Sequence, residues 1–439
     1  MSHNMPILTD LINLISQGGN RKPLEGIGIV YIHHPLRTSF NVILGMIQLG
    51  AHPEDIFVLG KSYSESPGVI QSINKLGVFY QPSSKQVALG GFSNAFVQDI
   101  NWLWLNVLGK LRKNVKKLII LDHGGHAMQF VPHEILRRLS ILGVEKTTGG
   151  LTAMAEYGSI PPFPIINVAG CAAKKIFESP LIAEAVLRKL ENIIPLGRKS
   201  LIFGVVGYGA IGRAVSNKLA SLGYRVLIYD KEKLNFEKGN NLTQVEEFDV
   251  MTSICDYIFG CTGTDITEKL SSFNLTNKDL SLVSCSSEDK EFLSLLRLIH
   301  KKTGCVIPKN PFADILYENE MNGRIRLVKG GFPVNFDFSG ESVPPNEIQL
   351  TRALVLGSLI QAVSFLNSQD SLENGEIYAL DPMLQRFLLR RWLDGQTNYA
   401  FSEDLIEASE DLDWLIKNSG GLYLPSQMEM YFEEELILH

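Results

Sequence analysis

The sequence predicts an α/β fold in which one α/β domain is inserted between an N-terminal α/β domain and a C-terminal helical segment. Apolar runs of strand length alternate with helical stretches over most of the chain, which is typical of mostly parallel sheets covered by helices on both faces. A glycine-rich turn between a strand and a helix begins a second such series in mid-chain. The expected domain boundaries are residues 1–195, 196–350 and 351–439.

The first domain is predicted from short apolar runs bounded by polar residues and glycines. A helix that ends at Gly50 follows the first of these runs, and a long helix followed by a hinge should close the domain. The expected strands are 28–32, 56–59 and 117–121, the expected helices are 39–49 and 181–194, and the expected hinge is 196–199.

A glycine-rich turn follows the apolar run 201–206 and precedes a predicted helix at 213–222. Gly207 allows the tight turn, and Gly209 allows the backbone to approach a pyrophosphate. Gly212 allows the helix to pack closely on the strand. These roles are those of the glycines in a dinucleotide-binding turn.

The segments that follow the glycines complete this motif. Ala210 and Ile211, at the start of the helix, offer free backbone N–H groups and the positive end of the helix dipole to phosphates. A second apolar run, 224–229, ends at Asp230, at the expected spacing of about twenty residues from the glycines. The Asp230 carboxylate can accept hydrogen bonds from a ribose 2′-hydroxyl, which favours NAD over NADP. Strand, glycines, helix, strand and acid together predict a Rossmann-type NAD-binding domain.

The NAD-binding domain is expected to continue through two further strands. The first, at 256–260, leads into the polar turn Cys261–Asp265, and the second covers 281–285. The run 326–331 should lie near the end of the domain, and the apolar helix 350–366 should return to the first domain.

Composition is that of a globular enzyme with two or three domains: 439 residues, 45% hydrophobic and 20% charged. A net charge of −6 without a long basic run argues against a nucleic-acid partner. The five cysteines lack CxxC spacing, which indicates reduced thiols in a cytoplasmic protein. We predict no signal peptide, no membrane-spanning run and no bound metal.

Several blocks of the sequence occur in an order that resembles the S-adenosylhomocysteine hydrolase family. The resemblance extends over about residues 20 to 270 and is faint at 330–335. The blocks are Lys22–Gly26 followed by a strand and His34, then Leu121–His126, Glu145–Gly149, Pro164–Val168, Lys174 with Phe177 and Glu178, Gly207–Gly209, and Cys261–Gly263.

The resemblance implies a specific chemistry. In this family a tightly held NAD oxidises the ribose 3′-hydroxyl to a ketone, which acidifies the neighbouring C4′ hydrogen. Loss of that proton expels the 5′ thiol. Water then adds, and the same cofactor reduces the ketone again. The resemblance makes Lys174 the base beside the 3′-hydroxyl, with Glu178 to orient it and His34 on the 5′ side. The resemblance also implies that NAD contacts Thr147, Thr148, Thr262, Gly263 and Asn335, in addition to the glycine turn and Asp230.

The sequence departs from the family pattern at positions that should face the ribose. His123 replaces an aspartate, Lys146 replaces a glutamate, and Ala169 replaces an asparagine. Because two carboxylates have become basic residues, His123 and Lys146 should favour an anionic ligand such as a phosphate or a carboxylate. Drift after loss of catalysis is the alternative explanation. The segment Glu288–Lys290 replaces the family's His-Phe-Asp segment.

These observations predict an NAD-dependent enzyme that oxidises the ribose 3′-hydroxyl of a nucleoside, either a thioether or an anionic analogue. The alternative is a catalytically inactive NAD-binding homologue that acts as a sensor or a regulatory partner. A simple hydroxy-acid dehydrogenase would need an arginine–glutamate–histidine set, for which we find no convincing candidates. The expected partner is a small nucleoside-type molecule, with neither nucleic acid nor membrane, and the resemblance implies a homo-oligomer.

Overall fold

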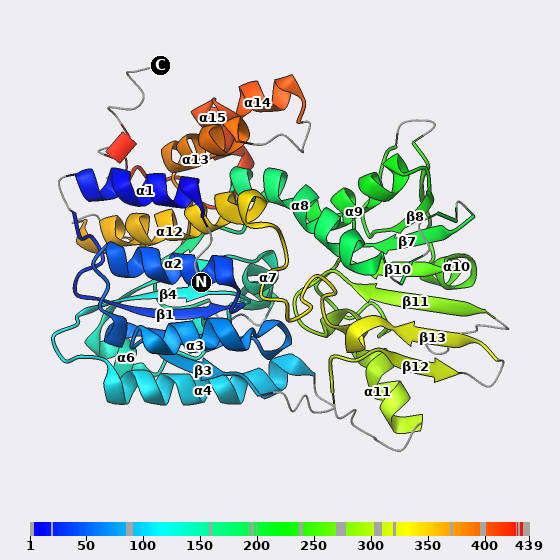
Figure 1. Cartoon of the computed structure of the whole chain (residues 1–439), viewed down its shortest axis with the longest axis horizontal. Helices are drawn as coiled ribbons and strands as arrows, with labels where there is room; N and C mark the ends of the chain where they lie inside the picture. Colours follow the sequence, from blue (N-terminus) through cyan, green and yellow to red (C-terminus); the bar gives the residue numbers. More distant parts are fainter. Residues whose placement is uncertain are drawn as a thin grey trace. The chain divides into compact units, whose positions relative to one another are not determined.

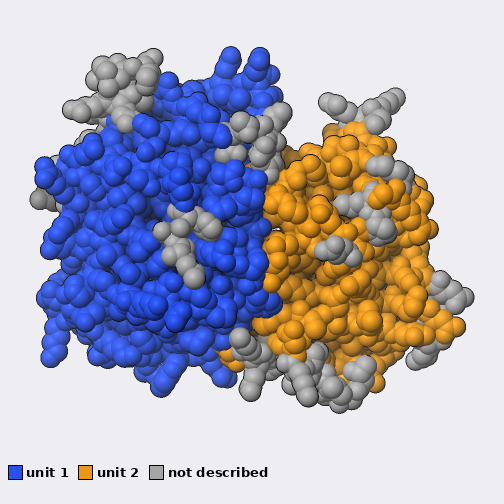
Figure 2. Space-filling model, viewed as in Figure 1, with its two compact units in different colours: residues 1–83, 97–178, 338–439 blue, residues 84–96, 179–337 orange. Residues whose placement is uncertain are grey.

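The computed structural model contains two seven-stranded sheets, each in its own compact unit (Figures 1 and 2). Unit 1 comprises residues 1–83, 97–178 and 338–439, and unit 2 comprises residues 84–96 and 179–337. The structure describes all residues except 1–3, 19–20, 85–90, 157, 159, 192, 195–196, 199, 237–239, 269–277, 303–309, 319–321, 369–371, 396–400, 427, 429–430 and 433–439.

Unit 1 is built on a parallel sheet in the order β14-β6-β5-β4-β1-β2-β3. The chain proceeds from β1 to β3 in one direction and from β4 to β6 in the other, so a topological switch lies between β1 and β4. Ligands of such sheets bind outside the carboxyl ends of the strands at this switch. The strands are β1 Ile27–His33, β2 Ile56–Gly60, β3 Phe79–Pro82, β4 Lys117–Asp122, β5 Ser140–Glu145, β6 Ile165–Asn167 and β14 Ile377–Ala379.

Helix α12, Pro345–Asn367, is the central helix of unit 1 and packs on α2, α1 and β5. Its length and composition would allow a membrane span, but 94% of its most apolar window is buried, as in the core helix of a globular domain. The predicted return of this helix to the first domain agrees with these contacts. The other helices of unit 1 are α1 Pro6–Gln17, α2 Arg37–Gln48, α3 Pro67–Lys75, α5 His126–Gln129, α6 His133–Arg138, α7 Thr148–Glu156, α13 Pro382–Asp394, α14 Glu403–Ser409 and α15 Leu412–Asn418, with short 3-10 turns at Pro53–Asp55 and Ser62–Ser64.

Unit 2 is built on a sheet in the order β12-β13-β11-β10-β7-β8-β9, parallel except for β12. Its topological switch lies between β7 and β10, so the predicted glycine turn after β7 lies at the switch. The strands are β7 Ile202–Val206, β8 Arg225–Tyr229, β9 Leu242–Gln244, β10 Tyr257–Gly260, β11 Asp279–Ser284, β12 Ile315–Glu318 and β13 Arg324–Leu327. The helices are α9 Ala210–Ser221, α10 Phe248–Ile254 and α11 Leu293–Lys302, with 3-10 turns at Lys290–Phe292 and Val328–Gly331.

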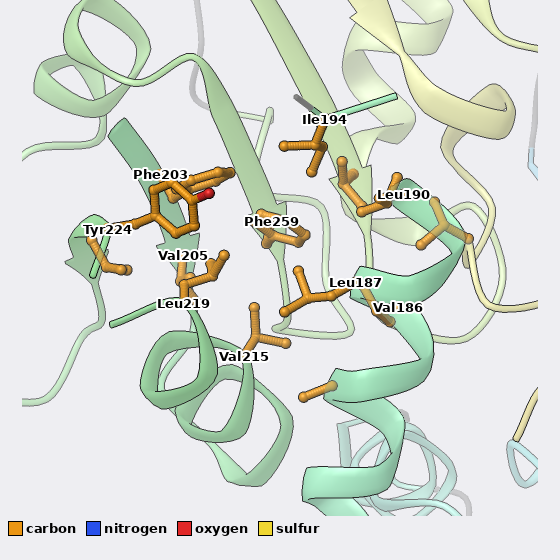
Figure 3. Packing of buried hydrophobic residues seen from close by; sticks show 14 of the residues in the cluster. Val186, Leu187, Leu190, Ile194, Phe203, Val205, Val215, Leu219, Tyr224 and Phe259 are labelled. Carbon is orange, nitrogen blue, oxygen red and sulfur yellow. The ribbon is translucent and has the colours of Figure 1, made fainter. Parts of the chain in front are cut away.

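The core of unit 2 forms where α9 and the second half of helix α8, Ala172–Leu190, pack on the sheet (Figure 3). Apolar side chains that recur at helical spacing on α8 and α9 meet alternate side chains of β7 and its neighbours. These buried residues include Val186, Leu187 and Leu190 of α8, Val215 and Leu219 of α9, Phe203 and Val205 of β7, and Phe259 of β10.

The structure corrects the predicted helix 181–194. Helix α8 covers Ala172–Leu190 and continues across Pro180, although a proline removes one intrahelical hydrogen bond. Helix α4, Phe92–Lys110, and α8 each contain a boundary between the two units, so the units do not divide at 195/196 or at 350/351. The C-terminal segment also supplies a strand, β14, which the sequence did not predict. Leu196 and Lys199 of the predicted hinge lie outside the described residues.

The other predicted elements agree with the structure within a few residues: strands β1, β2, β4, β7, β8, β10 and β11 and helices α2, α9 and α12. The four cysteines within the described ranges are free thiols, and Cys305 lies outside them.

Candidate functional site

Four neighbouring strands of unit 1 are each followed directly by a basic or imidazole residue. Lys146 follows β5, His123 follows β4, His34 follows β1 and Lys61 follows β2. These strands are adjacent and parallel, so the four residues follow one another along the carboxyl edge, on both sides of the switch between β1 and β4. We call these four residues, together with Arg352, the basic edge. The predicted site residues His34, His123 and Lys146 are thus brought together.

Hydrogen bonds determine the tautomers of the two histidines. The Ser64 hydroxyl donates to the Lys61 carbonyl oxygen (2.9 Å), so it must accept from His34 Nδ1 (2.8 Å). His34 therefore carries its proton on Nδ1 and accepts through Nε2, which makes His123 Nε2 the donor across the 3.1 Å contact between the two Nε2 atoms. Burial, followed by the charge of Lys61, lowers the pKa of His34 well below its ordinary value. Burial, followed by the effect of His34, also lowers the pKa of His123 well below its ordinary value. Both rings are therefore neutral at pH 7.

Lys146 and Arg352 contact neutral groups. Lys146 Nζ donates to the Ile32 carbonyl oxygen (3.2 Å) and lies 4.6 Å from the centre of the Tyr31 ring. Arg352, on α12, donates from Nε to the Thr38 hydroxyl (3.2 Å). Burial, and next the charge of Arg352, lowers the pKa of Lys146 well below its ordinary value. Arg352 and Lys61 did not appear among the residues predicted from the sequence.

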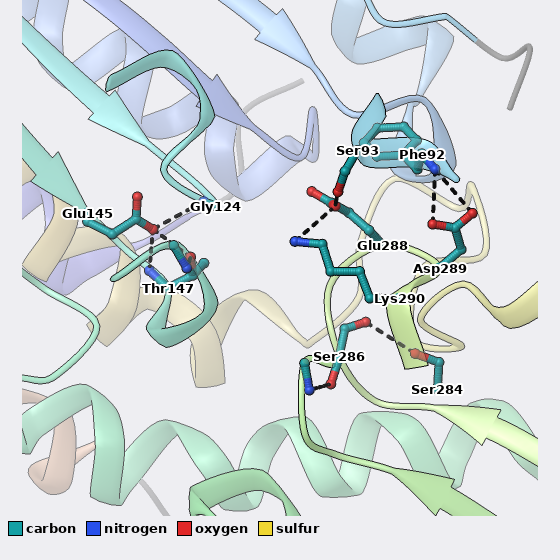
Figure 4. Close-up of polar contacts among 12 residues, drawn as sticks. Phe92, Ser93, Gly124, Glu145, Thr147, Ser284, Ser286, Glu288, Asp289 and Lys290 are labelled. Atoms are coloured by element: carbon teal, nitrogen blue, oxygen red, sulfur yellow. Dashed lines mark hydrogen bonds and ion pairs between the residues drawn. The ribbon is translucent and has the colours of Figure 1, made fainter. Parts of the chain in front are cut away.

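Two buried carboxylates hold the turns that follow β4 and β5, and Figure 4 shows the contacts of one of them, Glu145, with Gly124 and Thr147. Glu145 accepts from the backbone N–H groups of Gly124 (3.1 Å), Gly125 (2.9 Å) and Thr147 (2.8 Å), and from the Thr147 hydroxyl (2.5 Å). Asp122 accepts from the backbone N–H groups of His123 (2.7 Å) and Met128 (3.0 Å). The carboxylates thus position the loops that carry the basic edge.

Lys174 and Glu178 form an ion pair of 2.7 Å at i and i+4 in the first two turns of α8. After burial and the charges of His34, Lys61 and Lys146, the positive charge of Lys174 also lowers the pKa of His123. The neighbouring Lys175 is exposed and donates to the Asn418 carbonyl oxygen (2.8 Å) instead. The predicted catalytic pair Lys174–Glu178 is therefore formed in the structure, on a helix.

The glycine turn of unit 2 fits a dinucleotide. Gly207 has φ +89°, which favours glycine, and a Cβ on Gly212 would lie 1.8 Å from the Gly207 carbonyl oxygen. A Cβ on Gly209 would meet no atom within 4 Å, so there is open space beside the uncapped N-terminus of α9. This space and the free N–H groups of Ala210 and Ile211 suit a pyrophosphate.

Asp230 follows β8 and faces the glycine turn. Its carboxylate accepts from the backbone N–H groups of Tyr208 (2.6 Å) and Glu232 (2.9 Å), which leaves lone pairs for ribose hydroxyls. Asn335 is buried and follows the bridge between Ser284 and Pro333 at the carboxyl edge of β11. Thr147 and Thr148 belong to unit 1, and their contact with NAD stays a prediction.

Glu291 is a functional candidate that the sequence did not indicate. It is fully buried and accepts from the backbone N–H groups of Thr262 (2.7 Å) and Gly263 (2.5 Å) and from the Thr262 and Ser286 hydroxyls. It therefore holds the predicted cofactor loop after β10. Two residues before it, Asp289 accepts from the Phe92 backbone N–H (3.0 Å).

The segment Glu288–Lys290 therefore has a structural role within unit 2. Besides the contact of Asp289 with Phe92, the Ser93 hydroxyl donates to Glu288, which also pairs with Lys290 at 3.3 Å (Figure 4). These contacts attach the segment 91–96 to the rest of unit 2, a connection that sequence patterns did not reveal.

The pH dependence of stability should report on Glu291. Burial raises its pKa from 4.5 to about 7, so between these values the folded protein holds a proton that the unfolded chain has lost. The contribution of Glu291 to the free energy of unfolding is therefore complete below about pH 4.5 and lost by about pH 7. In this interval the free energy of unfolding falls by up to about 1.4 kcal/mol per pH unit. Glu291→Gln should make the fall in melting temperature between pH 5 and pH 7 shallower. Part of the pH dependence of the melting temperature should remain, because burial also raises the pKa of Asp289, to about 6.

The control is Glu246→Gln at an exposed site, which should keep the pH dependence of the wild-type protein. An unchanged pH dependence of the melting temperature in Glu291→Gln would contradict the expectation.

Comparison with known proteins supports the cofactor domain. Residues 190–282 match the family described as D-isomer specific 2-hydroxyacid dehydrogenase, NAD binding domain. This match confirms the predicted Rossmann-type domain and, with the relatives below, its cofactor, NAD.

Two sorts of relatives were found. An uncharacterized protein, present in two strains of Mycobacterium tuberculosis, is 26% identical over 387 residues, which cover 86% of this chain and 72% of the relative. The adenosylhomocysteinase of Sulfurisphaera tokodaii is 31% identical over 142 residues, 30% of this chain and 32% of that enzyme. The adenosylhomocysteinase of Sulfolobus acidocaldarius is 28% identical over the same length. The chain thus has an NAD-binding domain of the dehydrogenase type and a partial, distant similarity to adenosylhomocysteinase.

Proposed function

We propose that the protein is an NAD-dependent enzyme that oxidises the ribose 3′-hydroxyl of a nucleoside-type substrate, with chemistry of the adenosylhomocysteinase type. The observation that carries this proposal is the Lys174–Glu178 ion pair, formed near the start of α8, the helix that follows the carboxyl end of β6. The NAD-binding domain and the similarity to adenosylhomocysteinase support it.

The proposed roles follow from the hydrogen-bonding capacity of each side chain. The glycine turn and Asp230 would hold NAD, which would supply an acceptor for the hydride of the carbon that bears the hydroxyl. Lys174 Nζ is the proposed acceptor of the hydroxyl proton, and Glu178, at 2.7 Å, would stabilise the ammonium. The two neutral histidines hydrogen-bond to each other through their Nε2 atoms, and a substrate hydroxyl could take over that hydrogen bond without meeting a charge. His34 and His123 therefore suit the polar, uncharged part of a substrate.

The test uses the protein as purified. Bound molecules are released by denaturation and identified by mass spectrometry. S-adenosylhomocysteine, adenosine and adenosine 5′-monophosphate are then added separately to the native protein, and near-ultraviolet absorbance reports reduced nicotinamide. We expect reduction with at least one of them. Bound NAD that stays oxidised with all three would contradict the proposal and favour an NAD-bound sensor or regulator.

A second candidate is oxidation of a 2-hydroxy acid, because the family model that matches residues 190–282 is the NAD-binding domain of such dehydrogenases. The same absorbance assay with D-2-hydroxy acids separates the two. Reduction by a 2-hydroxy acid and by no nucleoside would replace the first candidate with the second.

A further inference from the structure

We propose that the basic edge binds an oxyanion, a phosphate or carboxylate carried by the substrate, through Lys61, Lys146 and Arg352. This proposal concerns the site of the proposed function and names its substrate class, but binding of the anion does not require that oxidation occurs. The three cationic side chains come from three separate segments, the ends of β2 and β5 and helix α12, and converge around His34 and His123.

Burial of these charges is the first support. Lys61 is 0% exposed and Lys146 is 7% exposed. Buried ammonium groups are costly unless charged partners and hydrogen bonds compensate them. Yet Lys146 contacts a carbonyl oxygen and an aromatic ring, and Arg352 contacts a hydroxyl. Within the described part of the chain, neither Lys146 nor Arg352 forms an ion pair with a carboxylate.

The nearby carboxylates do not replace the missing anion. Asp122 and Glu145 offset part of the positive charge, but their oxygens accept from backbone N–H groups and the Thr147 hydroxyl. Turning either carboxylate towards Lys146 would leave those buried donors unsatisfied, which costs about 1–3 kcal/mol for each group. A ligand is therefore the proposed source of the oxygen atoms that would complete the contacts of Lys146 and Arg352.

The remaining exposure of the site allows a ligand to enter. Arg352 and His123 are half-buried, whereas Lys61, Lys146 and His34 are buried behind them. A ligand that enters beside Arg352 and His123 therefore meets the guanidinium first. Arginine suits this position because its planar fork binds phosphate and carboxylate through two parallel hydrogen bonds.

Proton uptake should accompany binding. Burial, and next the positive charge of Arg352, lower the pKa of Lys146, and a bound anion acts in the opposite direction, so the free site takes up protons when the anion binds. Affinity should therefore fall as pH rises. The groups that act on Lys146 or lie beside it are Arg352 from α12, Lys61 after β2, Glu145 and Asp122 at the ends of β5 and β4, and Tyr31, His33 and His34 of the β1 segment.

Titration calorimetry on the full NAD-loaded chain tests the proposal. The probes are adenosine, adenosine 5′-monophosphate, adenosine 5′-carboxylate and inorganic phosphate. We expect a monophosphate or carboxylate nucleoside to bind at least tenfold more tightly than adenosine, with phosphate as a competitor. Whichever of adenosine 5′-monophosphate and adenosine 5′-carboxylate binds more tightly shows whether the site prefers a phosphate or a carboxylate. Titrations in buffers of different ionisation enthalpy should show net proton uptake.

Variants test which side chains bind the oxyanion. Lys146→Met and Arg352→Gln should each lower the preference for the anionic nucleoside over adenosine at least tenfold, because the anion loses more affinity than adenosine does, whereas Lys175→Met should leave the preference unchanged. If Lys146→Met does not fold, the half-buried Arg352→Gln and the wild-type preference decide the question. Equal affinity for adenosine and both anionic probes would overturn the proposal, as would equal losses for charged and neutral probes. If the anionic probe binds tightly but NAD stays oxidised, the proposed oxidation is refuted and the proposed anion site is not.

Discussion

Lys174→Ala should lower the rate of NAD reduction by substrate about 10²–10⁴-fold, the usual contribution of a positioned base, while NAD stays bound. The reason is local: Lys174 is the member of the α8 ion pair that can take a proton from a hydroxyl, and the cofactor turn belongs to unit 2. Single-turnover absorbance measures the rate, and mass spectrometry of the denatured protein measures the NAD content.

Lys175→Ala is the matched control, since Lys175 is the adjacent lysine on the same helix and its ammonium contacts Asn418. It should reduce NAD at the wild-type rate. Undiminished reduction in Lys174→Ala would remove Lys174 from the mechanism. A parallel loss in both variants, or a large fall in melting temperature, would indicate damage to α8 rather than loss of a base.

Gly212→Ala should abolish NAD binding and destabilise unit 2 by at least about 1–3 kcal/mol, the usual cost of overpacking. The new Cβ would lie 1.8 Å from the Gly207 carbonyl oxygen, so either α9 or the turn before it must move. Because the atom in its way is backbone, no change of rotamer relieves the contact. Thermal unfolding and the NAD content of the purified variant measure the two effects.

Gly209→Ala separates cofactor binding from folding. Its Cβ would meet no protein atom within 4 Å, and its backbone is extended, so the stability of the NAD-free protein should be unchanged. The same methyl group projects into the space predicted for the pyrophosphate and should weaken NAD binding. The expectation for Gly212 fails if Gly212→Ala retains a full complement of NAD and its wild-type melting temperature.

The cofactor domain could be predicted because its signal is local. Within about thirty residues the glycines, the helix and Asp230 specify a strand–turn–helix–strand unit. His34 and Lys146 were predicted from the family resemblance, and in the structure each directly follows a strand, β1 and β5. The carboxyl edge of a parallel sheet collects such residues, whatever their distance along the chain.

The remainder of the site depends on tertiary contacts. Arg352 reaches the basic edge because α12 packs against α2 and β5, and no pattern near residue 352 indicates that packing. Lys61 could have been found from its position directly after the strand 56–60. The helix predicted at 181–194 left Lys174 outside it. In the structure α8 begins at Ala172, because burial of its apolar face outweighs the one hydrogen bond that Pro180 removes.

The division of the chain between the two units has a consequence for biosynthesis. All strands of the unit 2 sheet lie between residues 202 and 327, so that sheet can form once this stretch has been synthesised. The unit 1 sheet gains its edge strand β14 and its central helix α12 only when residues 345–379 emerge, although β1 to β6 are made first. The strands translated first therefore keep an apolar face open while the later unit folds. Such a nascent chain is prone to association during slow translation and is a natural client for chaperones that shield apolar surface.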